Sequence, residues 1–250
     1  MTNVVCFIPA RYESSRLPGK PLLTINNKPI IQLVYEQVKK CNLVNDIYIL
    51  TDDERIRYKC ESFGAKCCII DAECLNGTER IVNFLKLDPS ICDIVVNVQG
   101  DEPFISHQNI DNCILNYIYQ KQNNPNMMCS TLHFKHTNTD EIAKRSNGKL
   151  VLDKHNNILY CSRNIIPGLK KTNYDASLTY YGHIGIFVYD KNYILNEYLD
   201  SNTPYQLAED IEWLKILEDG YKINSVLAVE HERGVDTPED YQYLKHKYEN

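Results

Sequence analysis

Residues 4–20 read Val4-Val5-Cys6-Phe7-Ile8-Pro9-Ala10-Arg11-Tyr12-Glu13-Ser14-Ser15-Arg16-Leu17-Pro18-Gly19-Lys20. The apolar run at the start predicts a buried strand, because a strand of a parallel sheet is covered on both faces. The residues after it form a loop whose backbone is restricted by Pro9, Pro18 and Gly19. Open α/β sheets bind ligands at the carboxyl ends of their strands, so this loop is a candidate binding site.

The loop carries three cationic side chains, those of Arg11, Arg16 and Lys20. Arginine supplies a planar fork of donors and lysine a mobile point charge, and both suit an anion with several phosphates. The alternative for such a basic cluster is a charged turn that only faces solvent. Because the loop follows the strand directly and is shaped by proline and glycine, the phosphate-binding interpretation is favoured.

Length and composition limit the class of protein. The 250 residues suffice for one α/β domain with a smaller embellishment. A net charge of −6 argues against nucleic acid as a partner, since nucleic-acid-binding surfaces are basic. No signal peptide or membrane-spanning stretch is recognisable, and the ten cysteines contain no Cys-x-x-Cys pair. We therefore expect a cytoplasmic protein with reduced thiols.

Strand-like and helix-like segments alternate in the first half of the chain, which predicts a parallel sheet with helices on both faces. The expected strands are 4–8, 46–50, 66–70 and 93–99, and the expected helices are 29–41, 53–63 and 78–87. After residue 127, strands are expected at 128–135, 149–153, 157–161 and 181–189, then a helix at 203–218, a strand at 222–229 and a helix at 237–248. The predicted fold class is a three-layer α/β fold with a mostly parallel sheet and a small antiparallel embellishment.

Six further motifs follow the opening loop. They are Thr51-Asp52-Asp53-Glu54-Arg55-Ile56, Gly77-Thr78-Glu79-Arg80, Val96-Asn97-Val98-Gln99-Gly100-Asp101-Glu102-Pro103, Ser162-Arg163, His183-Ile184-Gly185-Ile186 and Gly234-Val235-Asp236-Thr237-Pro238-Glu239-Asp240. Together with residues 9–21, they resemble, in the same order, the motifs of the 3-deoxy-manno-octulosonate cytidylyltransferases (CMP-Kdo synthetases). The related acylneuraminate enzymes usually open with a loop rich in Gly, Ser and Lys, so residues 16–20 argue against them.

The resemblance implies a nucleotidyltransferase (Rossmann-like) fold in a single domain. Residues 1–128 would be mainly the nucleotide-binding half, residues 129–185 the antiparallel embellishment with dimer and sugar contacts, and residues 186–250 a return to the sheet. It further implies a homodimer and a role in lipopolysaccharide biosynthesis.

The activity implied is a Mg²⁺-dependent transfer of CMP from CTP to the anomeric hydroxyl of a 3-deoxy-2-ulosonic acid, in the first place Kdo. Catalysis would consist of positioning and charge neutralisation, and no residue stands out as a general base. Two alternatives stay open: the same chemistry on amino-Kdo or a nine-carbon acid, and a catalytically inactive nucleotide-sugar-binding protein. The presence of Lys20, Asp101 and Asp236 speaks against the inactive protein. A Rossmann dehydrogenase is disfavoured because no Gly-x-Gly-x-x-Gly follows the first strand.

Asp101 and Asp236 are the expected metal ligands. Each follows a predicted strand, and Mg²⁺ commonly takes one or two carboxylates while keeping several waters. The structural alternatives are a Gly-Asp turn at residues 100–101 and a cap of the last helix, made by Asp236 or Thr237 in front of Pro238. The resemblance favours the metal role for both aspartates.

The resemblance places CTP on three parts of the chain. The expected contacts are Pro9, Ala10, Arg11, Arg16, Lys20, Thr51, Asn76, Gly77, Thr78 and Arg80. Of these, Lys20 and Arg11 join the two aspartates as expected catalytic residues. Gly77 permits a close approach of the backbone to the cytosine. Taken alone, residues 76–80 are an ordinary helix N-terminus.

The ulosonic acid is expected at Gln99, Arg163, His183, Glu212, Phe187 and Trp213. Arg163 can engage a carboxylate through two parallel hydrogen bonds, and His183 is expected to donate to the carboxylate or to a hydroxyl. Relatives usually carry a basic residue at position 182, Tyr at 187 and Gln at 213. The loss of these polar groups predicts a changed preference among acids. The alternative is that both aromatic side chains pack in the core.

Overall fold

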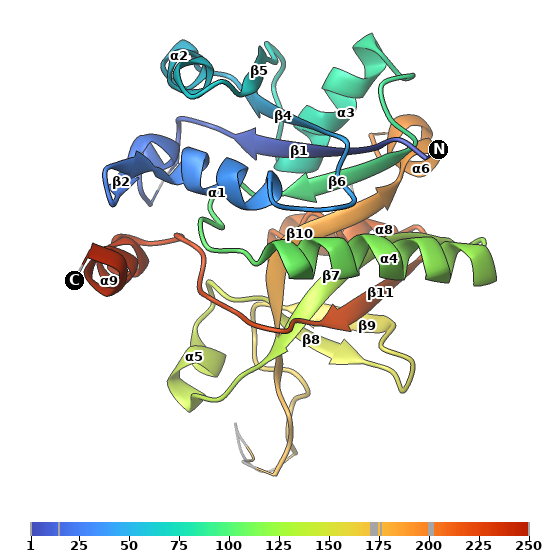
Figure 1. The fold of residues 1–250 in the computed structure, drawn as a ribbon. Helices are drawn as coiled ribbons and strands as arrows, with labels where there is room; N and C mark the ends of the chain where they lie inside the picture. The colour runs from blue at the N-terminus through green and yellow to red at the C-terminus, as the bar shows by residue number, and fades with distance from the viewer. Residues whose placement is uncertain (1, 15, 171–174, 176, 200–202, 250) are drawn as a thin grey trace. The chain divides into compact units, whose positions relative to one another are not determined.

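The computed structural model describes residues 2–14, 16–170, 175, 177–199 and 203–249, and Figure 1 shows it as a ribbon. The chain divides into two compact units. The first consists of Met1–Asp111 and His231–Asn250, and the second of Asn112–Glu230. These boundaries differ from the expected divisions at residues 128 and 185, and the single-domain organisation stays a prediction.

The first unit is built on parallel strands in the order β5-β4-β1-β6. The central strand β1 (Val4–Ala10) pairs with β4 (Asp46–Thr51) and β6 (Ile94–Val98), and β5 (Lys66–Ile69) pairs with β4. Residues 5–8 are fully buried, as expected for a strand with both faces covered.

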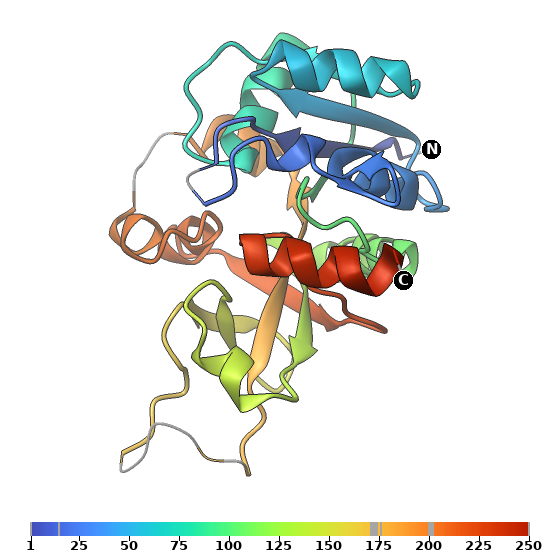
Figure 2. The same cartoon turned by 90° about the vertical axis from the view of Figure 1, so that its left-hand side faces the viewer.

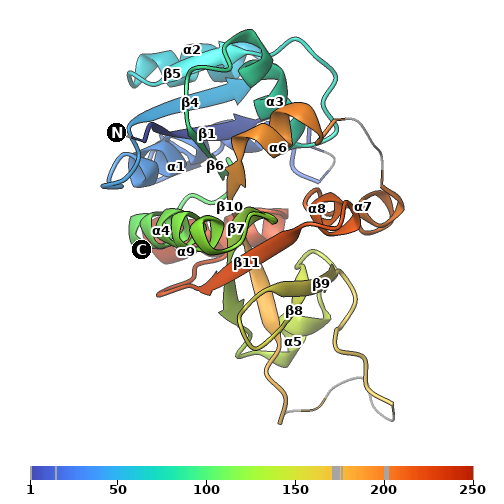
Figure 3. The ribbon, with the colours of Figure 1, turned by 90° about the vertical axis from the view of Figure 1, so that its right-hand side faces the viewer.

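Helices α1 (Ile30–Val38), α2 (Glu54–Ser62) and α3 (Gly77–Leu87) connect these strands. In Figures 2 and 3, α1 and α3 lie on opposite sides of the sheet, which gives the unit three layers. The strands and helices expected in this half are confirmed, with ends that shift by three residues or fewer. The buried apolar residues of α1 lie at positions i, i+1, i+4 and i+8 of the helix, which is the spacing of a single helix face: Ile30, Ile31, Val34 and Val38.

The C-terminal helix α9 (Pro238–Glu249) belongs to the first unit. It packs against the hairpin of β2 (Thr24–Ile25) and β3 (Lys28–Pro29), around a buried cluster of Ile25, Ile30, Val235 and Leu244. The short 3₁₀ helix η1 (Lys20–Leu22) precedes this hairpin. The rings of Phe104 and Tyr248 stack with centroids 3.7 Å apart. This packing brings the segment before α9 to the N-terminal loop.

The second unit contains the antiparallel strands that were expected. β7 (Met127–Lys135) runs antiparallel to β10 (Tyr181–Asp190) and parallel to β11 (Lys222–Leu227). β8 (Lys149–Leu152) pairs antiparallel with both β10 and β9 (Ile158–Ser162). The predicted fold class, a mostly parallel sheet with an antiparallel embellishment, is thus confirmed.

Helix α4 (His107–Asn123) was not expected, and most of it belongs to the second unit. In Figures 1 and 3, this helix and α8 (Leu214–Glu218) lie on opposite sides of the strands β7, β10 and β11. Asn116 attaches α4 to the sheet, because its Nδ2 donates to Ser130 Oγ (2.8 Å) and Asn224 Oδ1 (3.0 Å).

The prediction of a single helix at 203–218 is wrong. The structure has α7 (Pro204–Glu209) and α8 instead, because Asp210 adopts a left-handed conformation (φ 51°) that ends α7. The short helices α5 (Thr139–Ala143) and α6 (Lys191–Asn196) were also not expected.

None of the ten cysteines, all of which lie in the described part of the chain, forms a disulfide. No helix in the described ranges has the length and apolar character needed to cross a membrane.

Candidate active site

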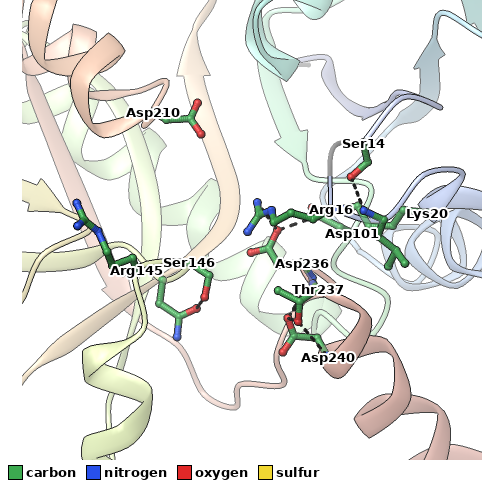
Figure 4. A network of polar contacts seen from close by, with 12 residues as sticks. Ser14, Arg16, Lys20, Asp101, Arg145, Ser146, Asp210, Asp236, Thr237 and Asp240 are labelled. Carbon is green, nitrogen blue, oxygen red and sulfur yellow. Dashed lines mark hydrogen bonds and ion pairs between the residues drawn. The ribbon is translucent and has the colours of Figure 1, made fainter.

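The first unit brings two cationic side chains against two aspartates (Figure 4). Lys20 Nζ lies 2.7 Å from Asp101 Oδ2 and 3.9 Å from Asp236 Oδ1. Arg16 Nη2 lies 3.5 Å from the same oxygen of Asp236. Three segments therefore meet here: the loop after β1, the loop after β6 and the segment before α9. The phosphate loop and the carboxylate pair, predicted separately, form one cluster.

The backbone sets the approach of residue 236 to residue 101. Val235 N donates to Asp101 O over 2.8 Å. A Cβ on Gly234 would lie 3.1 Å from Asp101 O and 3.3 Å from a carboxylate atom of Glu102, so glycine permits this close approach. At the other side of the cluster, Gly19 adopts a φ of 69° and begins η1, which carries Lys20.

The charges of this cluster are tightly linked. Partial burial raises the pKa of Asp236, the neighbouring Asp101 carboxylate raises it further, and Lys20 and Arg16 oppose this effect. A cation beside the two carboxylates reduces their mutual repulsion, and Lys20 Nζ supplies one here. Two carboxylates directed at one cationic group are also a donor set that suits Mg²⁺. Within the described ranges, His, Cys, Asp and Glu side chains form no group of three or more that could hold a metal.

Capping of α9 and the candidate metal site use different side chains of the segment that contains Asp236 and Thr237. Thr237 Oγ1 accepts from Asp240 N (3.2 Å), and Asp240 Oδ2 accepts from Thr237 N (3.0 Å), so these two residues cap the start of α9 reciprocally (Figure 4). The Asp236 carboxylate instead faces Arg16 and Lys20. The helix cap therefore does not use the side chain that was expected to bind metal.

Several expected CTP residues lie around the end of β1. Pro9 and Ala10 end the strand, and the following Arg11 is exposed. Thr51 is buried at the end of β4, where its hydroxyl accepts from Asp53 N over 3.3 Å. A Cβ on Gly77 would lie 2.7 Å from Pro9 Cγ, so the close approach that this glycine allows is to Pro9. Its contact with cytosine stays a prediction.

The polar groups of residues 76–80 bond within the protein. Asn76 caps α3, since its Oδ1 accepts from the backbone N–H of residue 79 over 2.9 Å. Thr78 Oγ1 accepts from Asn97 Nδ2 over 3.3 Å, and both residues are buried. Arg80 is buried as well and pairs with Asp52 Oδ2 at 2.8 Å. These contacts attach the N-terminus of α3 to β6 and to the residue that follows β4. Direct CTP contacts of the three residues stay predictions.

Arg163 has all five guanidinium N–H groups engaged in the second unit. Its acceptors are Glu209 O (2.6 Å), Arg145 O (3.2 Å), Ser146 O (3.1 Å), Asp210 O (2.7 Å) and Asp210 Oδ2 (3.3 Å). Arg145, Ser146 and Asp210 are labelled in Figure 4. The guanidinium thus joins the end of α7 to the loop before β8. Binding of a carboxylate by Arg163, which stays a prediction, would require some of these bonds to be exchanged.

Lys149 reinforces the same loop and was not singled out from the sequence. Its buried ammonium donates to Lys144 O, Asn147 O and Arg163 O over 2.6–2.8 Å. Burial lowers the pKa of Lys149 to about 8. The sequence gives no signal for this role, because a lysine that bonds buried carbonyl groups and a lysine that only faces solvent look the same at the start of a strand.

Phe187 and Trp213 are buried, with 1% and 2% of their surfaces exposed. Their ring centroids each lie 5.1 Å from that of His183, in the second unit. This burial supports the alternative that both aromatics pack in the core, and a direct contact with the acid stays a prediction. Gln99 and Glu212 are partly exposed and belong to the first and second units, respectively.

Gly182 explains why this chain has no basic residue at that position. In the pairing of β10 with β7, Gly182 stands opposite Phe134. A Cβ there would lie 2.3 Å from Phe134 Cζ and 2.7 Å from His136 Nε2. The phenyl ring therefore occupies the space that a longer side chain would need.

Gly182→Ala should destabilise the protein by about 1–3 kcal/mol, because the added methyl group overpacks the contact with Phe134. Equilibrium unfolding in urea measures this change. Combining it with Phe134→Leu, which removes the clashing ring atoms, should recover part of the loss. An unchanged unfolding midpoint in the single variant would contradict the packing described here.

Comparisons with known proteins agree with these observations. The family model described as "Cytidylyltransferase" matches residues 5–223. The chain is 36% identical to the 3-deoxy-manno-octulosonate cytidylyltransferase of Protochlamydia amoebophila, over 95% of this chain and 91% of that protein. It is 38% identical to the 8-amino-3,8-dideoxy-manno-octulosonate cytidylyltransferase of Shewanella piezotolerans, over 95% of each.

Among solved structures, the chain resembles a CMP:2-keto-3-deoxy-manno-octonic acid synthetase complexed with CTP, with a TM-score of 0.85. The two are 31% identical, and the match covers 98% of each chain. The family suggested by the seven motifs is thereby confirmed. This chain belongs to the cytidylyltransferase family, in the group that contains the 3-deoxy-manno-octulosonate cytidylyltransferases.

Proposed function

We propose that this protein transfers CMP from CTP to the anomeric hydroxyl of Kdo and releases pyrophosphate. The observation that carries the proposal is the cluster in which Arg16 and Lys20 of the N-terminal loop face Asp101 and Asp236. Cations that bind phosphate oxygens, beside carboxylates that bind a divalent cation, are the components required for nucleotidyl transfer. An inactive binding protein would not need the carboxylate pair.

In the proposed reaction, the anomeric oxygen attacks the α-phosphorus of CTP. A new O–P bond forms, the bond from this phosphorus to the bridging oxygen of the pyrophosphate group breaks, and the hydroxyl proton is released to solvent. Arg11, Arg16 and Lys20 would hold the triphosphate and neutralise the charge that develops on the departing pyrophosphate. Their contribution is positioning and electrostatic stabilisation, and no covalent intermediate with the protein is involved.

Asp101 and Asp236 would hold Mg²⁺, the metal that best suits two carboxylates beside a triphosphate. When bound, Mg²⁺ supplies charge neutralisation and lowers the pKa of the attacking hydroxyl. Lys20 Nζ would have to leave Asp101 when the metal binds, and would then be available to a phosphate oxygen. The 2.7 Å contact between Lys20 and Asp101 places a cationic group where this carboxylate would face the metal.

For the acid, the proposal uses Gln99, Arg163, His183 and Glu212, as the family motifs imply. The 8-amino analogue of Kdo is a second candidate acceptor, because a relative that bears its name is as similar to this chain as the Kdo enzymes are. We further propose, on the family resemblance, a homodimer that acts in the cytoplasm in lipopolysaccharide biosynthesis.

CTP should be preferred over ATP, GTP and UTP by at least about a hundredfold in kcat/KM, since the backbone at residues 76–78 would read the edge of the pyrimidine. Pyrophosphate release, measured with each nucleotide and a fixed concentration of Kdo, tests this. Repeating the series with the 8-amino acid separates the choice of nucleotide from the choice of acceptor. Equal turnover with ATP would reject the cytidylyl assignment.

A further inference from the structure

Thr131, which no motif of the sequence singled out, lies in β7 beside the expected sugar residue His183 of β10. Its side chain is buried. Thr131 Oγ1 lies 2.6 Å from the carbonyl oxygen of Ile186 and 2.9 Å from His183 Nε2. One hydroxyl therefore contacts two groups of the neighbouring strand, which Figure 3 shows beside β7.

The direction of these two hydrogen bonds follows from elementary chemistry. A hydroxyl has one proton, and a carbonyl oxygen can only accept. At 2.6 Å, the two oxygens of Thr131 and Ile186 must share a proton, because two lone pairs would repel at that distance. The hydroxyl proton is thus committed to Ile186. The contact with His183 can then form only if Nε2 carries a proton and donates it to Thr131.

An irregularity in the sheet creates this arrangement. His183 pairs with His133 and Ile184 with Leu132, but the next pair is Phe187 with Thr131. Residues 185 and 186 are therefore additional in β10 and form a β-bulge. Bulges redirect groups near functional sites. Here the bulge accompanies the approach of both the Ile186 carbonyl and the His183 ring to the same threonine.

The protonation state of His183 completes the assignment. Burial lowers the pKa of His183 to about 3, so its ring carries a single proton at neutral pH. If that proton is on Nε2, then Nδ1 holds a lone pair and can only accept a hydrogen bond. A carboxylate, which is itself only an acceptor, does not suit this nitrogen.

We propose that Thr131 is a positioning residue for recognition of the acid: it holds His183 in the Nε2–H tautomer, so that Nδ1 accepts a hydrogen bond from a hydroxyl of the ulosonic acid. This inference rests on the proposed function. It replaces the expectation that His183 donates to the carboxylate or a hydroxyl of the acid, and it makes His183 selective for a hydroxyl donor.

The tautomer can be measured by long-range ¹H–¹⁵N correlation spectra of the full chain labelled with ¹⁵N-histidine. His183 in the wild-type protein should show the pattern of a neutral Nε2–H ring. Thr131→Val keeps the shape of the side chain but removes the hydroxyl, so this pattern should be lost or mixed with that of the other tautomer. Thr131→Ser keeps the hydroxyl, so this variant should retain the pattern of the Nε2–H ring.

Steady-state kinetics test the consequence for the acid. Thr131→Val should raise KM for Kdo about tenfold, the effect of one lost hydrogen bond, without a matching change in KM for CTP. Thr131→Ser should restore most of this loss. Ser225→Ala is the matched control, because Ser225 Oγ also contacts a ring nitrogen of a histidine on a neighbouring strand, His133 Nδ1 (2.8 Å). It should alter the resonances of His133 and leave KM for Kdo unchanged.

A wild-type spectrum with an Nδ1–H ring at His183 would overturn the proposal, and this holds even if Thr131→Val does not fold. A Thr131→Val protein that folds and keeps the wild-type KM for Kdo would overturn it as well. If the wild-type protein formed no CMP-Kdo, the proposed function would fail instead. The spectrum, recorded without substrates, separates that result from an incorrect tautomer.

Discussion

Asp101→Asn should lower turnover with CTP and Kdo by at least about a hundredfold, and Asp236→Asn should do the same, because each removes a negative charge directed at the metal and phosphate site. Asn has nearly the shape of Asp, so the loop after β6 should keep its backbone contact with Val235. Initial rates of pyrophosphate release over a range of Mg²⁺ concentrations measure the loss. A rise in the Mg²⁺ concentration needed for half-maximal rate is expected as well.

Asp71→Asn is the matched control, since Asp71 is exposed on the same unit and lies outside the cluster. Its rate should equal that of the wild-type protein. Circular dichroism and thermal unfolding establish that each variant is folded. If Asp101→Asn and Asp236→Asn both fold and turn over at near wild-type rates, the assignment of the metal site is wrong.

Lys20→Ala should weaken CTP binding by between about tenfold and a hundredfold, the usual effect of removing a hydrogen bond to a charged group. The unfolding midpoint should change much less, because Asp101 and Asp236, which lose their cation, are 21% and 39% exposed and can be solvated. Isothermal titration calorimetry with CTP measures the affinity directly. Arg16→Ala should show a smaller loss, since the Arg16 side chain is 49% exposed.

Lys28→Ala provides the control for this substitution. Lys28 is on the surface of the same unit, and its carboxylate partner is Glu36 rather than Asp101 or Asp236. The Lys28→Ala variant should bind CTP with the affinity of the wild-type protein. If Lys20→Ala also binds CTP with unchanged affinity, the phosphate-binding interpretation is wrong. The N-terminal loop would then be a charged turn that only faces solvent.

The first unit could be predicted well because its strands are covered on both faces. Such strands appear in the sequence as continuous apolar runs, of which residues 4–8 are the example. Helix α4 was missed, although the spacing of Ile110, Cys113, Ile114 and Tyr117 is that of an amphipathic helix, and all four residues are buried. That signal was present in the sequence.

The break between α7 and α8 could not be read from the sequence in the same way. It depends on Asp210, a non-glycine residue with positive φ, and on contacts between distant groups. Glu218 of α8 accepts from the backbone N–H groups of Tyr205 and Gln206 over 3.1 and 3.0 Å, so it caps the start of α7. Arg163 holds the other end of α7. Helical periodicity alone continues through all of these residues.

The candidate site also combines features that the sequence predicts with features that depend on the folded chain. Residue types and motifs predicted that Lys20, Asp101 and Asp236 belong to it, and the structure places them in one cluster. The bonding of Arg163 to backbone carbonyls was not predictable, because its acceptors come from segments that meet only in the folded chain. The same holds for Thr131, whose contact with His183 depends on a bulge in β10.

Nuclear magnetic resonance of the products tests the central claim most directly. The purified chain is incubated with CTP, Kdo and Mg²⁺, and ³¹P and ¹H spectra follow the reaction over time. We predict CMP-Kdo and pyrophosphate in equal amounts, no product after chelation of the metal, and recovery when Mg²⁺ is restored. Unchanged CTP, or CTP hydrolysed without formation of a CMP-linked ulosonic acid from Kdo or its 8-amino analogue, would contradict the account.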